Sequence, residues 1–323
     1  MGVDEAETQT MTPKRASRRP LPVLERGTCV GRYVILDRIG VGGMGVVYRA
    51  YDPDLDRRIA LKLVRAVSED ATARLVREAQ ALAKVSHPNI VQIFDVGVFG
   101  DTVFIAMELV EGRTLSKWNR ETSPSWRVLL AHLIEAGRGL AAVHAAGLVH
   151  RDFKPQNAIV GADGRVRVLD FGVARSASVE LDAPALADDE GDLPRVVVSQ
   201  VTGTPVYMAP EQQHRGVIDA RADQFAFAVT CWELLHGERP FLGDNLREYL
   251  HATATGRFRP PPAGNATPTW VRRALLRGMA AAPQDRHRSM DAVLAALSAD
   301  PARRHRRLAA MGSRSWPPWR SAS

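Results

Sequence analysis

The pattern of apolar and polar positions along the chain changes character near residue 112. Before that point, short apolar runs bounded by glycine, proline and charged residues predict strands, and apolar positions at helical spacing predict one helix at residues 69–85. After it, longer apolar segments at residues 126–146 and 220–235, with two or three shorter ones up to residue 299, predict helices. The expected strands before residue 112 are residues 33–36, 46–48, 59–64, 90–94 and 102–107.

The composition argues against a disulfide-rich, a membrane-spanning and a secreted protein. The chain has 323 residues, of which 45% are hydrophobic and 24% are charged, as is typical of a globular protein. The two cysteines, Cys29 and Cys231, are too few for a disulfide framework and favour a reducing compartment, so we expect a cytoplasmic protein. No apolar run reaches about 18 residues and the N-terminus is polar, so we expect neither a membrane-spanning helix nor a secretory signal.

The net charge of +7 is concentrated at one end of the chain. Residues 301–323 contain six arginines and no acidic residue, which leaves only +1 for the remainder. The basic character therefore belongs to a tail, residues 300–323, and not to the fold, so we expect no specific nucleic-acid binding. Residues 1–32 predict a disordered leader, and residues 175–200, with six acids and no periodicity, predict a mobile loop.

Candidate chemistry is densest in the loop at residues 150–157, where Asp152, Lys154 and Asn157 supply a carboxylate, an amine and an amide. Pro155 disfavours helical geometry at Lys154, so a tight loop between strands at Val149 and at residues 158–160 turns the three side chains into one cavity. A carboxylate can take a hydroxyl proton, an ammonium can neutralise a phosphate and an amide oxygen can bind magnesium. Taken alone, these residues also fit an ordinary polar turn.

Glycines 40, 42 and 45 form a G-x-G-x-x-G pattern between two strands, where backbone amides can approach phosphate oxygens closely. A β-branched strand follows, which disfavours a dinucleotide-binding fold, and the Gly-Lys-Ser/Thr of P-loop NTPases is missing. Lys62 is the one charge in the next apolar strand, and Glu78 lies beside the apolar stripe of the helix, where it could pair with Lys62. Each of these two charges alone also fits a solvated surface.

Two further features complete the candidate set. Asp170 ends a buried-looking strand, where a second metal carboxylate would be useful, and residues 108–112 form a connector whose backbone could bind an adenine edge. His132 and His144, on the helix at residues 126–146, are interpreted as packing or surface residues.

Together, these motifs resemble those of the bacterial eukaryotic-type (Hanks-type) serine/threonine protein kinases, and the resemblance covers residues 33–297. It implies an α+β class and a bilobal protein kinase fold, with a small N-lobe of antiparallel sheet plus one helix and a larger, mostly helical C-lobe. The kinase domain would span residues 33–299, divided into an N-lobe at 33–107, a hinge at 108–112 and a C-lobe at 113–299. The motifs that carry the resemblance are the glycine loop, Lys62, Glu78, the 150–157 loop, Asp170-Phe171-Gly172 and Ala209-Pro210-Glu211.

The resemblance also implies roles. Asp152 would accept the proton of the substrate hydroxyl, and Lys154 would neutralise the γ-phosphate of ATP. Lys62, paired with Glu78, would bind the α- and β-phosphates, and Asn157 and Asp170 would bind Mg²⁺, with Mn²⁺ as an alternative. The remaining nucleotide-binding positions would be Ile39, Gly40, Val41, Gly42, Gly43, Met44, Gly45, Val46, Val47 and Ala60, the gatekeeper Met107, and Glu108 and Val110 of the hinge.

Lys154, two positions after Asp152, and Thr204 are typical of serine/threonine rather than tyrosine kinases. In the family, an arginine such as Arg151 pairs with an activation-loop phosphate, so Thr202 and then Ser199 are candidate phosphorylation sites. The resemblance further implies that Glu211 pairs with Arg286 and that Asp223 anchors the catalytic-loop backbone; Phe153 departs from the commoner leucine.

We therefore expect a serine/threonine protein kinase with protein substrates, autophosphorylation in a transient homodimer and a signalling role. A pseudokinase scaffold is disfavoured by the intact Lys62, Asp152, Asn157 and Asp170. A small-molecule kinase of related fold is disfavoured because residues 202–211 resemble a peptide-binding platform. For the basic tail we favour a solvated end over a membrane contact, and any nucleic-acid binding through it would be secondary and salt-sensitive.

Overall fold

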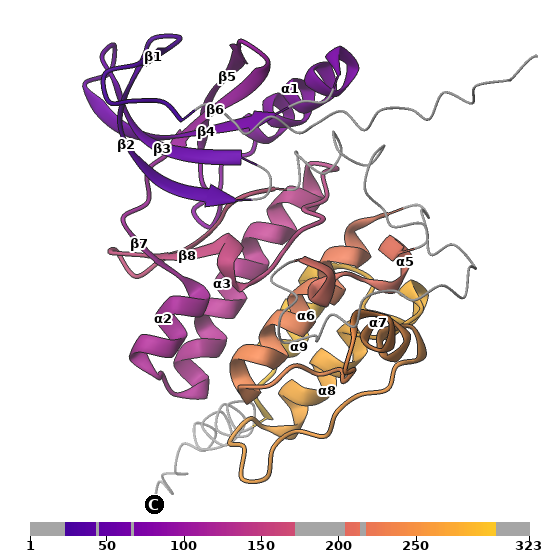
Figure 1. Ribbon diagram of the computed structural model, residues 1–323. Helices are drawn as coiled ribbons and strands as arrows, with labels where there is room; N and C mark the ends of the chain where they lie inside the picture. The colour runs from indigo at the N-terminus through magenta and orange to yellow at the C-terminus, as the bar shows by residue number, and fades with distance from the viewer. Residues whose placement is uncertain (1–22, 43–44, 66–67, 172–203, 214–217, 302–323) are drawn as a thin grey trace, which may run out of the picture.

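The computed structural model describes residues 23–42, 45–65, 68–171, 204–213 and 218–301. These residues form two lobes, one rich in strands and one rich in helices, which are joined by the segment between β6 and β7 (Figure 1). The change from strands to helices that the hydrophobic pattern predicts near residue 112 is confirmed.

The sheet of the N-lobe has six antiparallel strands in the order β1-β2-β3-β4-β6-β5. Its two faces contribute to different apolar clusters because successive side chains of a strand point to opposite faces. On β6, Val103 and Ile105 pack in the cluster that contains helix α1, whereas Phe104 and Ala106 belong to the cluster on the other face. The strands are β1 (Cys29–Val30), β2 (Tyr33–Gly42), β3 (Gly45–Asp52), β4 (Arg57–Arg65), β5 (Ile93–Phe99) and β6 (Thr102–Glu108).

Helix α1 (Glu69–Ala83) forms where the sequence predicts it, and ends two residues earlier. The side chain of Ser68 accepts a hydrogen bond from the backbone N–H of Ala71, and Glu69 and Asp70 lie in the first turn, where the helix dipole favours acidic residues. Leu75 is one of the residues that make the buried stripe facing the sheet.

Two predicted strands differ from the structure. Strand β5 begins at Ile93 and not at residue 90, because the preceding residues pair with the C-lobe: Val91 N–H donates to the Val168 carbonyl and Val168 N–H donates to that of Asn89, both at 2.9 Å. Val149 lies in no strand. The backbone N–H groups that follow it donate to a buried carboxylate, described below, and not to a neighbouring strand.

The C-lobe is built around α6, whose residues are buried on nearly every side. Helices α3, α8 and α9 each pack against α6, and α9 also packs against α3 and α8 (Figure 1). Among the described residues, α3 is the one helix long and apolar enough to cross a membrane, and its apolar residues are part of this core. The helices are α2 (Leu115–Thr122), α3 (Trp126–Ala145), α5 (Pro210–Gln213), α6 (Ala220–His236), α7 (Leu246–Thr255), α8 (Thr269–Gly278) and α9 (Met290–Ser298).

A second, three-stranded sheet lies where the two lobes meet, formed by β7 (Gly112–Thr114), β8 (Ala158–Gly161) and β9 (Val166–Val168). Strand β8 directly follows the catalytic-loop candidates, and β9 ends two residues before Asp170. Because Ala158 at the start of β8 pairs with Val168 at the end of β9, this sheet places the 150–157 loop next to the segment that contains Asp170.

Candidate active site

The three side chains of the 150–157 loop converge. Lys154 Nζ lies 2.8 Å from Asp152 Oδ2, and Asn157 Nδ2 donates to the backbone oxygen of Asp152 at 2.8 Å and to its Oδ2 at 3.3 Å. Asp152 and Asn157 are buried, and Lys154 is half-buried. The loop is tight because a 3-10 helix, Pro155–Asn157, begins directly after Lys154, with the proline at its first position.

Asp223, fully buried on α6, holds the start of this loop. Its carboxylate accepts hydrogen bonds from the backbone N–H groups of His150, at 2.7 Å, and Arg151, at 2.8 Å. Arg151 has a left-handed φ of 64°, an unfavourable conformation for a non-glycine residue, and these two bonds hold the backbone in it. The anchoring role predicted for Asp223 is confirmed.

His144 Nε2 lies 2.7 Å from Asp223 Oδ2 and is the third partner of that carboxylate. We interpreted His144 from the sequence as a packing or surface residue. A single histidine on an apolar helix carries no signal for such a contact, because its partner lies on another helix, 79 positions along the chain. His132, on the same helix, stacks on Trp118 with ring centroids 4.3 Å apart, which fits the packing interpretation.

His150 is fully buried and links the two candidate loops. Its Nδ1 accepts from the backbone N–H of Asp152 at 3.3 Å, so Nε2 carries the proton and donates to the Leu169 carbonyl at 3.1 Å. Burial lowers the pKa of His150, so its ring stays neutral at pH 7. The ring also packs against Phe171, at 4.9 Å between centroids.

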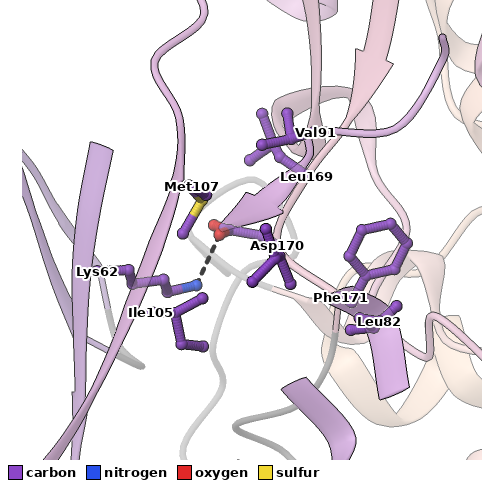
Figure 2. A pocket seen from close by; sticks show the side chains of 9 residues that line it. Lys62, Leu82, Val91, Ile105, Met107, Leu169, Asp170 and Phe171 are labelled. Carbon is purple, nitrogen blue, oxygen red and sulfur yellow. Dashed lines mark hydrogen bonds and ion pairs between the residues drawn. The ribbon is translucent and has the colours of Figure 1, made fainter. Parts of the chain in front are cut away.

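Lys62 and Asp170 face each other from opposite lobes (Figure 2). Lys62 Nζ lies 2.6 Å from Asp170 Oδ1, and the Lys62 side chain is 11% exposed. The predicted pairing of Lys62 with Glu78 is corrected by this structure, in which the Glu78 carboxylate lies 4.0 Å from Arg151 Nη1. Sequence spacing places Glu78 on the correct helix but does not fix how that helix is rotated and shifted relative to β4.

A small cavity of about 30 Å³ lies behind this ion pair, next to Met107 and Phe171 (Figure 2). Its other lining residues are mostly apolar, for example Leu82 of α1. The cavity has room for about one water molecule. The cavity is therefore too small to hold a nucleotide.

The glycine pattern lies on the hairpin of β2 and β3, in which Gly42 pairs with Gly45. A Cβ at Gly45 would collide with the backbone oxygen of Leu63, so glycine is required there for the contact with β4. Ile39 and Val41 are large apolar residues that remain 44% and 68% exposed, as expected for residues that cover a flat apolar ligand. Gly43, Met44, Gly172, Ser199 and Thr202 lie outside the described residues, as does the side chain of Thr204.

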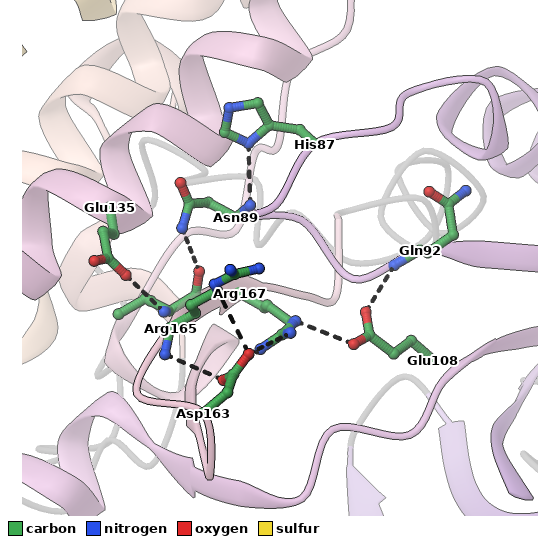
Figure 3. Close-up of polar contacts among 9 residues, drawn as sticks. His87, Asn89, Gln92, Glu108, Glu135, Asp163, Arg165 and Arg167 are labelled. Atoms are coloured by element: carbon green, nitrogen blue, oxygen red, sulfur yellow. Dashed lines mark hydrogen bonds and ion pairs between the residues drawn. The ribbon is translucent and has the colours of Figure 1, made fainter.

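The other predicted nucleotide-binding positions lie on β4 and at the end of β6. Ala60 is buried on β4, and Glu108 ends β6 just before Val110. The Glu108 side chain, at the start of the 108–112 connector, forms an ion pair with Arg167: its Oε1 lies 3.0 Å from Arg167 Nε (Figure 3). The sequence pattern gave no sign that Arg167 contacts this segment.

Glu211 and Arg286 form the predicted pair, with two parallel bonds of 2.6 and 2.8 Å. The Arg286 side chain is fully buried. This pair joins the segment after the 204–207 turn to the C-lobe core.

In the C-lobe, the Asp152 carboxylate lies beside the Lys154 ammonium. The Lys62 ammonium of the N-lobe faces a second carboxylate, that of Asp170. Because the amide nitrogen of Asn157 is used by Asp152, its oxygen is the end available to a cation. The described residues contain no group of three His, Cys, Asp or Glu side chains that could form a metal site. Asn157 and Asp170 supply an amide oxygen and a carboxylate, which are oxygen ligands of the kind that hard divalent cations prefer.

Comparison with known proteins gives a consistent picture. The protein kinase domain family matches residues 33–294. The chain is 36% identical over 287 residues to serine/threonine-protein kinase pkn2 of Myxococcus xanthus, covering 83% of this chain and 33% of that protein. It is 34% identical over 298 residues to serine/threonine-protein kinase Pkn1 of the same organism, covering 87% and 41%. The chain thus spans about a third to two fifths of the length of these two relatives.

The fold has a similar solved structure. The crystal structure of the Mycobacterium tuberculosis PknI kinase domain superposes with a TM-score of 0.64 and 25% sequence identity, covering 85% of this chain and 98% of that one. Nearly the whole of that domain is therefore matched by this chain.

Proposed function

The chain belongs to the protein kinase family, and we propose that it transfers the γ-phosphate of ATP to serine and threonine hydroxyls of proteins. The observation that carries this proposal is the convergence of Asp152, Lys154 and Asn157 opposite the pair formed by Lys62 and Asp170. Relatives that cover more than four fifths of the chain bear the name serine/threonine-protein kinase.

Phosphoryl transfer depends on positioning and charge neutralisation more than on covalent chemistry. In the proposed mechanism, the Asp152 carboxylate orients the substrate hydroxyl and accepts its proton, and Lys154, 2.8 Å away, balances negative charge on the transferring group. Lys62 binds phosphate oxygens from the side of the N-lobe. Asp152 is well suited to this role because the loop bonds described above keep its carboxylate in place.

Protein kinases as a family use ATP and a divalent metal ion. We propose Mg²⁺, held by the Asn157 amide oxygen and the Asp170 carboxylate, with Mn²⁺ as a substitute. The ion would supply neutralisation of the phosphate charge. The ion pair between Lys62 and Asp170 supports this assignment, because it brings together the two charges that a phosphate and its cation would each need.

Serine/threonine specificity is supported by Lys154, two positions after Asp152. We further propose protein substrates, autophosphorylation through a transient homodimer with Thr202 as the first candidate site, and a cytoplasmic location. The two described cysteines, Cys29 and Cys231, form no disulfide, which fits a reducing compartment. For the basic tail, residues 300–323, we keep the proposal of a solvated end.

The test is autophosphorylation of the purified chain with ATP and magnesium, beside Asp152→Asn, with sites mapped by mass spectrometry. We expect label on serine and threonine in the wild type only, including residues 195–204. If neither protein is labelled, with generic protein substrates and manganese also tried, the kinase proposal fails, and binding of ATP then tells whether the chain is a nucleotide-binding scaffold.

A further inference from the structure

The connector between the lobes lies against the hairpin of β8 and β9. Ala162 N–H, in the turn of that hairpin, donates to the Glu111 carbonyl at 2.8 Å, and Gly112 pairs with Gly161 of β8. The C-terminal end of the connector is thus fixed by backbone contacts. Its N-terminal end, Glu108, is reached by a side chain from the same hairpin.

That side chain is Arg167, which divides its guanidinium between two carboxylates (Figure 3). Its Nη1 and Nη2 donate to the two oxygens of Asp163 at 3.0 and 2.8 Å, and its Nε lies 3.0 Å from Glu108 Oε1. The Arg167 side chain is 15% exposed. The hydrogen bonds from Arg167 lower the pKa of Asp163 to about 2, so Asp163 stays charged and keeps the guanidinium oriented toward Glu108.

The local sequence leaves space for this arrangement. A Cβ at Gly161 would lie 2.6 Å from Asp163 Oδ1 and 2.9 Å from Arg167 Nη1, so any larger residue would push against the ion pair. The same Cβ would be 3.5 Å from Val110 Cγ1, which shows how closely the connector follows the hairpin. Glycine at this position therefore permits both contacts at once.

Joining the lobes does not require Arg167. The backbone bonds between Val168 and the 89–91 segment already connect the N-lobe to β9. Glu108 is also tied to its own lobe, since its N–H donates to the Gln92 carbonyl at 2.9 Å and its Oε2 lies 3.5 Å from Gln92 N. What Arg167 adds is a fixed position for the Glu108 side chain relative to the C-lobe.

We propose that Arg167 is a positioning residue for nucleotide binding: anchored by Asp163, it holds Glu108 and thereby the connector backbone that receives the adenine. This inference rests on the proposed function. A segment ordered before binding loses less conformational freedom when the ligand arrives, so pre-organisation raises affinity. The groups proposed to transfer phosphate lie on other loops, so the turnover rate at saturating ATP should depend little on Arg167.

The test compares Arg167→Met with Arg113→Met. Arg113 lies on β7 of the same sheet and pairs with Glu121 at 3.2 Å, away from the Glu108 side chain. We expect Arg167→Met to raise the KM for ATP and the Kd of ATP by about three- to tenfold, with kcat within about twofold of wild type. Arg113→Met should change neither. Arg167→Lys, which keeps the charge but not the fork, should restore part of the affinity.

Coupling to Glu108 is checked with a double-mutant cycle. Glu108→Gln should raise the Kd in the same direction, and adding Arg167→Met to it should change the Kd little further. An unchanged KM for Arg167→Met, a fall in kcat without a change in Kd, or a rise in kcat would each overturn the proposal. Thermal unfolding identifies a variant that does not fold, in which case Asp163→Asn, a milder change expected to act in the same direction, decides.

Direct ATP binding, measured by calorimetry in the Asp152→Asn background, separates the two proposals. A wild type that binds ATP without transferring phosphate would refute the kinase activity and still allow the effect of Arg167 on Kd to be measured. If the wild type is active and Arg167→Met has the same Kd for ATP, the positioning role alone would be refuted.

Discussion

Replacing Arg286 by methionine removes the most completely satisfied charge in the described C-lobe. All five guanidinium N–H groups are used: Nε donates to the Ala280 carbonyl at 2.8 Å. Nη1 donates to Glu211 at 2.6 Å and to the Arg221 carbonyl at 2.8 Å. Nη2 donates to the second Glu211 oxygen at 2.8 Å and to the Ala281 carbonyl at 3.1 Å. Methionine fills a similar volume but supplies none of these donors.

The expected loss of unfolding free energy in Arg286→Met follows from the groups that are left without their hydrogen-bond donor. The Glu211 carboxylate, only 13% exposed, keeps its charge without a partner, and three backbone carbonyls lose a donor. Breaking a buried pair by removing one partner typically costs about 3–5 kcal/mol of unfolding free energy. For a domain of this size, about 1 kcal/mol shifts the melting temperature by about 2–4 °C, so we expect a fall of roughly 10 °C.

The matched control is Arg259→Met. Arg259 Nη1 lies 2.8 Å from Glu238, but both side chains are 38% exposed. Exposed pairs contribute about 0–1 kcal/mol, so this variant should melt close to the wild type. Thermal and urea unfolding followed by circular dichroism measure both changes. Equal losses in the two variants, or a loss below about 1 kcal/mol for Arg286→Met, would show that burial does not set the strength of these pairs.

Two further outcomes are expected. Asp223→Ala removes the acceptor for two backbone N–H groups of the catalytic loop. The kcat should therefore fall by about 10²-fold or more, with a smaller change in the Kd of ATP. Retention of full turnover would exclude an anchoring role for Asp223. Burial lowers the pKa of His150 and of three other histidines, so below about pH 6.5 the unfolded chain binds more protons than the folded one, and the unfolding free energy should decrease with falling pH. Urea titrations at pH 7.5 and 5.5 test this, and His150→Gln should show a shallower decrease.

Sequence reasoning succeeds here where the determinants are local. The strands before residue 112 and helix α1 follow from hydrophobic periodicity, and the convergence of Asp152, Lys154 and Asn157 follows from a proline-containing loop of eight residues. Such features are decided within a few residues of chain, so their pattern is visible without tertiary structure.

It fails where a partner comes from a distant segment. Glu78 is correctly placed on its helix, yet the position of that helix decides whether it meets Lys62 or Arg151. His144 and Arg167 are polar residues in largely apolar elements. Their partners lie on other elements, so no local pattern distinguishes them from solvated or packed side chains. The predicted strand at Val149 is wrong for a similar reason, since the N–H groups of the next two residues, His150 and Arg151, donate to Asp223 and not to a neighbouring strand.

The contacts between the lobes differ in kind from the rear of the cleft to the front. At the rear, Val168 exchanges backbone hydrogen bonds of 2.9 Å with Asn89 and Val91, three residues that are all largely shielded from water. At the front, the described polar contacts are between side chains: the ion pair of Lys62 and Asp170, whose carboxylate is 32% exposed, and the contact of Glu78 with Arg151. A phosphate can replace the carboxylate as partner of Lys62, and a cation can replace the ammonium as partner of Asp170, whereas nothing in a nucleotide can replace the backbone bonds of β9. We therefore expect the lobes to rotate about β9 when the cleft is filled, with the front contacts exchanged and the rear contacts retained.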